Sequence, residues 1–140
     1  MSLKRIYCID SNPADLASLQ VILGGRYQLL LLTDPSYAFR EILMNQPNLL
    51  LVDQEVRGIG ALQFIKRINS AEPSLMQRTL LITKDPNAAE VKAITDMGCS
   101  GVLLKPYNAD LILTSVKMVI SRPNTYTSQK RSPFSEPNEY

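Results

Sequence analysis

Five short runs of almost entirely apolar residues recur along the chain, separated by intervals long enough for one helix and two loops. Each run is apolar on successive residues rather than on alternate ones, which is typical of strands buried on both faces of a parallel sheet. Parallel neighbours also need a crossover connection, and the intervals provide one. The runs predict strands at Ile6–Ile9, Leu29–Leu32, Leu49–Val52, Leu80–Ile82 and Val102–Leu104.

Helix signals follow these runs. Asn12-Pro13, Asp34-Pro35 and Asp85-Pro86 each combine an N-cap residue with a proline at the first helical position. The last of these pairs predicts a fourth helix at about residues 87–97, ended by Gly98. The apolar positions expected to face the sheet are Leu16, Leu19, Ile22 and Leu23, then Ala38, Phe39, Ile42 and Leu43, then Leu62, Ile65 and Ile68, and finally Leu111, Val116, Val119 and Ile120.

The alternation predicts an α/β fold of the flavodoxin-like (βα)5 type. Such a fold is doubly wound, with a five-stranded parallel sheet in the order 2-1-3-4-5 and helices on both faces. We expect the domain to span residues 1–121. Residues 122–140 are rich in proline and serine and poor in large apolar groups, so they are expected to form a flexible C-terminal tail or the start of a linker.

The composition of the 140 residues excludes several functions. Fifteen Lys and Arg against 13 Asp and Glu leave a net charge of +2, so there is no electrostatic case for direct binding of nucleic acid or membrane. Histidine is absent, which rules out catalytic triads with an imidazole and His-ligated zinc. Cys8 and Cys99 are too few for a zinc site. With no membrane-span-length apolar run and no signal-peptide core, we expect a cytoplasmic protein.

The candidate chemistry lies at the strand ends. Asp10, Ser11, Asp53, Thr83 and Lys105 follow strands one, three, four and five, and open α/β sheets form their sites at this edge. Two carboxylates facing each other across the switch point repel unless a cation lies between them. The available cations are Mg²⁺ and the ammonium of the lysine. A carboxylate beside a cation and a hydroxyl is suited to phosphoryl transfer with the carboxylate as nucleophile.

Residues 6–13, 49–53, 80–83 and 98–106 together resemble the receiver domains of two-component response regulators, the CheY-like family, over about residues 4–120. The resemblance implies that Asp53 is the phosphoacceptor. It implies that Asp10, Asp53 and the backbone carbonyl of Glu55 hold Mg²⁺. Thr83 would contact a phosphoryl oxygen, and Lys105 would pair with the phosphoryl group. It further implies a cis peptide bond before Pro106.

Several positions depart from the family pattern, and among them Val56-Arg57 stands where Met-Pro is usual. Ser11 replaces the second of two adjacent acids, so the affinity for Mg²⁺ should fall, and whether its hydroxyl binds the metal stays open. The acidic side chain of Glu55 could partly replace the missing charge. Lys84 stands where a small residue is usual and could crowd the site or attract an anion. Val102 replaces the aromatic switch residue, which puts the output rearrangement in question.

The resulting hypothesis is a receiver that accepts a phosphoryl group from a histidine kinase or phosphotransfer protein. Thr83, Val102 and Pro106 would then bias a face built by the fourth helix, fifth strand and fifth helix, which an output domain or partner protein reads. No second substrate is implied, so the only expected chemistry is self-phosphorylation from small donors and slow autodephosphorylation. Two alternatives stay open: a pseudo-receiver that binds partners without phosphorylation, and a flavodoxin-like FMN binder. The second is weakened by a first turn without glycine.

Overall fold

The computed structural model describes residues 2–123. It confirms the expected sheet, in which all pairs of neighbouring strands are parallel and the order is β2-β1-β3-β4-β5. The three central strands are apolar because both of their faces are covered, whereas β2 and β5 are partly exposed edge strands. The strands are β1 (Arg5–Ile9), β2 (Gln28–Leu32), β3 (Leu49–Asp53), β4 (Thr79–Thr83) and β5 (Gly101–Leu104).

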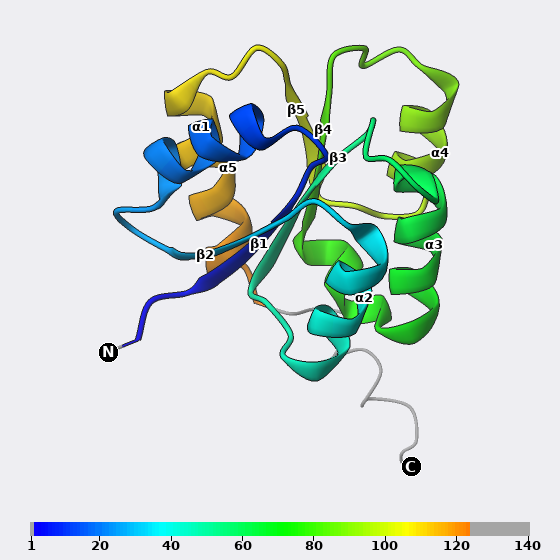
Figure 1. Cartoon of the computed structure of the whole chain (residues 1–140), viewed down its shortest axis with the longest axis horizontal. Coiled ribbons are helices and arrows are strands. Elements are labelled where there is room, and N and C mark those ends of the chain that lie inside the picture. Colours follow the sequence, from blue (N-terminus) through cyan, green and yellow to red (C-terminus); the bar gives the residue numbers. More distant parts are fainter. Residues whose placement is uncertain (1, 124–140) are drawn as a thin grey trace.

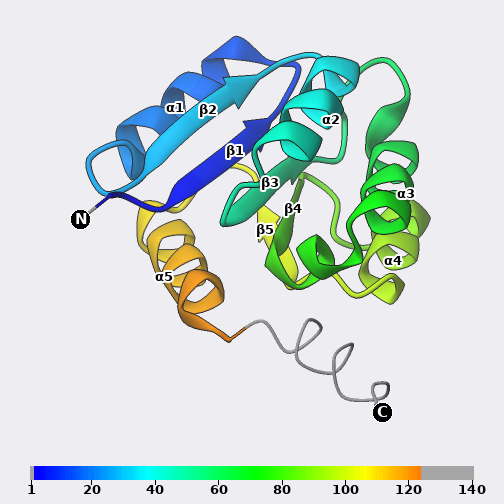
Figure 2. The ribbon, with the colours of Figure 1, turned by 90° about the horizontal axis from the view of Figure 1, so that it is seen from below.

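Helices cover both faces of this sheet, as expected (Figure 1). Figure 2 shows α1 and α5 on one side, and α2, α3 and α4 on the other. A 3₁₀ helix precedes β4 and was not expected from the sequence. The helices are α1 (Pro13–Leu23), α2 (Pro35–Met44), α3 (Gly60–Ala71), α4 (Ala89–Asp96) and α5 (Ala109–Ser121), and the 3₁₀ helix is η1 (Pro73–Arg78).

The sheet separates two hydrophobic cores because successive side chains of a strand point to opposite faces. In β1, Tyr7 and Ile9 pack with α2, α3 and α4, whereas Ile6 and Cys8 pack with α1 and α5. The same alternation runs through β3 and β4. Two filled cores hold the central strands rigidly, so the residues that follow those strands have well-defined positions.

Two of the three expected helix starts are confirmed. The Asn12 side chain accepts a hydrogen bond from Ala14 N at 2.9 Å, and the Asp34 side chain accepts one from Ser36 N at 3.0 Å. The third prediction, a helix start at Asp85-Pro86, is wrong. There the carboxylate accepts from Asn87 N within a turn, and α4 begins only at Ala89. Asp-Pro suits a turn as well as a helix start, and the local sequence does not separate the two.

Some apolar positions expected to face the sheet do not. Leu43 and Leu111 are exposed, with relative accessibilities of 48% and 62%. In α5 the buried residues are Ile112, Val116 and Val119, so the expected Val116 and Val119 are confirmed and Ile112 takes the buried place expected for Leu111. The expected tail lies almost entirely outside the described residues, which end two residues after α5.

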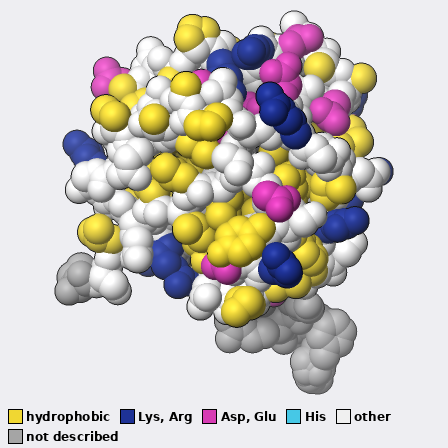
Figure 3. Space-filling model, viewed as in Figure 1, with side chains coloured by type: hydrophobic (Ala, Val, Ile, Leu, Met, Phe, Trp, Pro, Cys, Tyr) yellow, Lys and Arg dark blue, Asp and Glu magenta, His cyan; other side chains and the backbone are white. Residues whose placement is uncertain are grey.

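The state of the cysteines and the distribution of charged side chains on the surface can be compared with the composition. Cys8 and Cys99 are free thiols, the first of them buried. On the face drawn in Figure 3, basic and acidic side chains are interspersed. Within residues 2–123, no helix is long and apolar enough to cross a membrane.

Candidate functional site

The carboxyl ends of the central strands bring the predicted residues together. Asp10 follows β1, Asp53 ends β3, Thr83 ends β4 and Lys105 follows β5. Both aspartates are almost fully buried, with relative accessibilities of 2% and 4%. They lie in a cleft of about 600 Å³ that is open to solvent at the top of the sheet. The site is therefore a buried acidic pair at the floor of an accessible cleft.

The Lys105 ammonium occupies the centre of this cleft. Its Nζ lies 2.9 Å from Asp53 Oδ1 and 3.2 Å from Asp10 Oδ2. A third carboxylate, Asp15 Oδ2, is 2.6 Å away. A lysine ammonium has three N–H donors, so three acceptors can engage all of them. The mutual repulsion of the buried aspartates is thus offset by a cation that belongs to the chain itself.

Burial and charge shift the pKa values of these groups. Burial raises the pKa of Asp53 and the charge of Asp10 adds to this, while the hydrogen bond and charge of Lys105 oppose it. Burial alone would lower the pKa of Lys105, but its hydrogen bonds to Asp15 and Asp53 raise that pKa above its usual value. The lysine therefore stays charged throughout the physiological range, as a group that stabilises anions must.

Backbone N–H groups orient both buried carboxylates. Asn12 N donates to Asp10 Oδ1 at 2.9 Å, and Glu55 N donates to Asp53 Oδ2 at 3.1 Å. The other oxygen of each carboxylate faces Lys105. The N–H of Asn12, which could cradle the phosphate of a bound FMN in a flavodoxin-like protein, is already bonded to an acid.

Thr83 begins a hydrogen-bonded connection from the site to α4. Its hydroxyl bonds to the side-chain oxygen of Gln54, the residue after Asp53. Gln54 Nε2 in turn donates to Glu90 Oε1 on α4 at 3.1 Å. The Thr83 hydroxyl also accepts from Asp85 N at 3.0 Å. These bonds link the phosphoacceptor candidate to the helix that was expected to take part in output.

Ser11 and Glu55 take positions that the sequence left open. Ser11 Oγ accepts a hydrogen bond from Arg57 N at 2.6 Å, so it joins the loop after β1 to the loop after β3. The Glu55 carboxylate is exposed and lies 3.7 Å from the Lys84 ammonium, itself exposed. The Glu55 side chain therefore contributes its charge at the rim of the cleft and not at its floor.

The sequence reasoning missed Asp15. This residue lies in the first turn of α1, whose start is fixed by the Asn12 cap and Pro13. Acids are common in the first turn of helices because the helix dipole favours them there, so the residue type alone carried no functional signal. The only available clue was its place four residues after Ser11, the position at which this chain lacks the second acid of the family pattern.

The residues present fit a Mg²⁺ ion. The Asp10 and Asp53 carboxylates and the Glu55 backbone carbonyl are the protein ligands that the resemblance implies for such an ion. Among residues 2–123, no three Asp, Glu, Cys or His side chains are placed to hold a metal ion together. This does not conflict with Mg²⁺, which is usually bound by one or two carboxylates and keeps several waters.

The remaining predicted positions lie around β5. Val102 is half-buried and packs against the core of α2, α3 and α4. The peptide bond between Lys105 and Pro106 is cis, as expected. Tyr107 lines a second cleft along α1, and its buried hydroxyl has no hydrogen-bond partner within residues 2–123.

Comparisons with known proteins agree with this geometry. No family model matches the chain. Two curated sequences are similar: the circadian input-output histidine kinase CikA of Synechocystis sp., 23% identical over 104 residues, and the sensor histidine kinase GacS of Pseudomonas protegens, 28% identical over 106 residues. The matches cover 74% and 73% of the chain, which spans only 14% and 12% of those kinases.

Solved structures of similar fold are receiver domains. One is the signal receiver domain of an HD domain-containing protein from Pseudomonas fluorescens, with a TM-score of 0.79 and 21% identity over 94% of this chain and 96% of that one. Another is a CheY-like response regulator receiver domain protein from Methanospirillum hungatei, with a TM-score of 0.76 and 20% identity over 94% and 100%. The chain therefore has the fold of the response regulator receiver domains.

Proposed function

We propose that this chain is a receiver domain of two-component signalling that accepts a phosphoryl group on Asp53. The observation that carries the proposal is the Lys105 ammonium within 3.2 Å of two buried aspartates, at the strand ends of a receiver fold. The donor would be a histidine kinase or phosphotransfer protein. The similarity to two histidine kinases supports a partner of this class.

The transfer is a displacement at phosphorus. A carboxylate oxygen of Asp53 attacks the phosphorus atom, a new P–O bond forms, and the P–N bond of a phosphohistidine breaks with its electron pair going to the imidazole nitrogen. Acetyl phosphate would react in the same way with acetate leaving. In the later hydrolysis, water attacks the phosphorus and loses a proton, the aspartyl P–O bond breaks, and inorganic phosphate and the carboxylate are released.

Each neighbour of Asp53 has a role in this reaction. Lys105 places a positive charge beside the reacting oxygen, which stabilises negative charge on the transferred phosphoryl group. The Thr83 hydroxyl is a hydrogen-bond donor at the end of the next strand. Asp10 with Asp53 and the Glu55 carbonyl would hold Mg²⁺, which neutralises phosphoryl oxygens when bound. Because Ser11 supplies no charge, we expect metal binding to be weaker than with two adjacent acids.

Output would pass through the hydrogen bonds of Thr83. If its hydroxyl turns toward a phosphoryl oxygen, it leaves Gln54, and the bond from Gln54 to Glu90 on α4 changes with it. Two exposed leucines, Leu104 on β5 and Leu111 on α5, lie on the expected output face. An output domain or partner protein would bind there. This route does not require an aromatic residue at Val102.

The direct test is intact-mass measurement after incubation with acetyl phosphate and Mg²⁺. We expect the wild-type chain to gain the mass of one phosphoryl group and Asp53→Asn to gain none. Asp96→Asn is the matched control because Asp96 is also an acid paired with a lysine, but an exposed one on α4. This control should be labelled like the wild type.

The opposite result favours the pseudo-receiver. If folded wild-type protein shows no adduct while a working receiver is labelled in the same reaction, Asp53 does not accept phosphoryl groups under these conditions. A labelled Asp53→Asn variant would place the modification on another residue and would equally contradict the proposal.

A further inference from the structure

The shortest contact of Lys105 is with Asp15 and not with either residue expected at the site. The Nζ to Oδ2 distance is 2.6 Å, against 2.9 Å for Asp53 and 3.2 Å for Asp10. The Asp15 side chain is 28% exposed, so its carboxylate is partly hydrated but its partner is not. Its backbone is held by the capped first turn of α1. Lys105 is thus tied to α1 as firmly as to Asp53.

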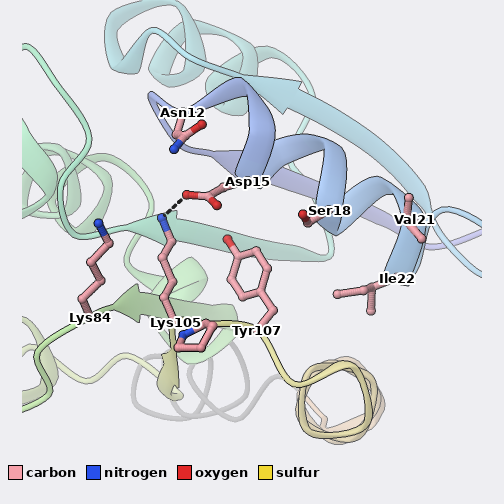
Figure 4. Close-up of a pocket in the computed structure, with 9 residues that line it drawn as sticks. Asn12, Asp15, Ser18, Val21, Ile22, Lys84, Lys105 and Tyr107 are labelled. Atoms are coloured by element: carbon pink, nitrogen blue, oxygen red, sulfur yellow. Dashed lines mark hydrogen bonds and ion pairs between the residues drawn. The ribbon is translucent and has the colours of Figure 1, made fainter.

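The ion pair of Asp15 with Lys105 also separates two clefts. Both residues line the cleft that contains Asp53 and a neighbouring cleft of about 860 Å³ that runs along α1 past Tyr107. Figure 4 shows the lysine reaching across this boundary to the aspartate, with the Tyr107 hydroxyl directed toward α1. The position of Lys105 therefore depends on a residue of α1 that borders both clefts.

Phosphorylation of Asp53 adds acceptors that compete for the N–H donors of the Lys105 ammonium. A phosphoryl group carries about 1.5 to 2 negative charges and three acceptor oxygens, and it replaces the single negative charge of the Asp53 carboxylate. The three donors of the ammonium are already directed at three carboxylates. Asp15 is not modified in the reaction, so it goes on drawing the ammonium toward α1, and its own charge repels the phosphoryl oxygens. Both effects disfavour the phosphorylated state.

We propose that Asp15 is a positioning residue that holds Lys105 against α1 and competes with the phosphoryl group of Asp53 for its charge, so that it limits phosphorylation of this chain. This inference rests on the proposed function. It also accounts for the acid that the chain lacks at Ser11. Asp15 brings a third carboxylate to the site, but this carboxylate contacts Lys105.

The test compares Asp15→Asn with the wild type in the acetyl phosphate reaction. We expect the initial rate of labelling to rise about fivefold, the order of effect expected from one partly exposed ion pair. We expect the adduct to last longer as well. Asp15→Glu keeps the charge and should label like the wild type. Asp96→Asn removes the same charge from a remote lysine pair and should leave the rate unchanged.

A purely structural role gives the opposite result. Loss of an acid from the first turn of a helix lowers stability slightly, and a less stable domain is not labelled faster. In a Lys105→Met background the Asp15→Asn substitution should change the rate much less, because the competition for the lysine is gone and only the direct repulsion of the phosphoryl oxygens by Asp15 remains. A rate for Asp15→Asn equal to or below that of the wild type overturns the inference and leaves the proposed function standing.

A readout without phosphorylation separates the two proposals. The ¹H–¹⁵N signal of the Lys105 ammonium, assigned by its loss in Lys105→Met, reports exchange of its protons with water. Asp15→Asn should speed this exchange if Asp15 holds the ammonium, and an unchanged signal contradicts the positioning role. If the signal responds but neither protein is labelled, the proposed function fails, and with it the competition.

Discussion

Two lysines stand at neighbouring strand ends of the site, and they differ in nearly everything except residue type. Lys105 after β5 is 9% exposed and contacts three carboxylates. Lys84 after β4 is 67% exposed and has one partner, Glu55, at 3.7 Å. The three contacts of Lys105 lie at the floor of the cleft, and the single contact of Lys84 lies at its rim.

The difference shows that burial, more than proximity, determines how much an ion pair contributes to stability. The Lys105 side chain is largely shielded from water. Removal of its ammonium would therefore leave buried carboxylates without a partner, which is costly to stability. Around Lys84, water and salt screen the pair, and holding two long side chains together costs entropy.

The largest expected effect follows from removing the buried cation. Lys105→Met should lower the free energy of unfolding by about 3 kcal/mol, because Asp10 and Asp53 are left as unpaired buried charges. The loss should shrink on acidification as carboxylates take up protons. Chemical denaturation at two pH values measures both. Lys92→Met, which removes an exposed lysine paired with Asp96, is the control and should change stability little.

A smaller effect is expected from the pH dependence of Asp53. Its raised pKa means that the folded state disfavours the ionised carboxylate, so Asp53→Asn should be more stable than the wild type at neutral pH. As the pH falls through this raised pKa, the folded wild type binds a proton before the unfolded chain does and gains stability. The difference between the two proteins should therefore decrease. A difference that grows on acidification would show that Lys105 lowers the pKa overall.

The smallest effect belongs to the rim. Lys84→Met should change the free energy of unfolding by less than about 0.5 kcal/mol, and the change should vanish in high salt. Glu55→Gln should behave alike. Thermal unfolding at low and high ionic strength measures this. A change as large as that of Lys105→Met would mean that the rim pair is less exposed to water than its geometry indicates.

Much of the fold could be predicted because strands and helix starts have local sequence patterns. Apolar runs such as Leu49–Val52 marked the strands, and Asn12-Pro13 marked the start of α1. The prediction was wrong where a local signal has two uses, as at Asp85-Pro86, which forms a turn before α4. It was also wrong for Leu111 of α5, which is exposed while the adjacent Ile112 is buried.

The candidate site was predictable in part. Asp10, Asp53, Thr83 and Lys105 were found because each follows a strand, and strands of a parallel sheet end at one edge. Their roles in phosphoryl transfer stay a proposal. Asp15 was missed because it is on a helix, where its charge has an ordinary local explanation.

The order of the elements, the parallel sheet and the edge of the sheet at which the polar residues collect could thus be predicted from local patterns in the sequence. These depend on periodicity and on caps, which act over a few residues. Which carboxylates share Lys105 follows instead from the packing of α1 against the sheet. Those contacts join residues as far apart in the chain as Asp15 and Lys105, and their strength depends on how much water the folded chain excludes.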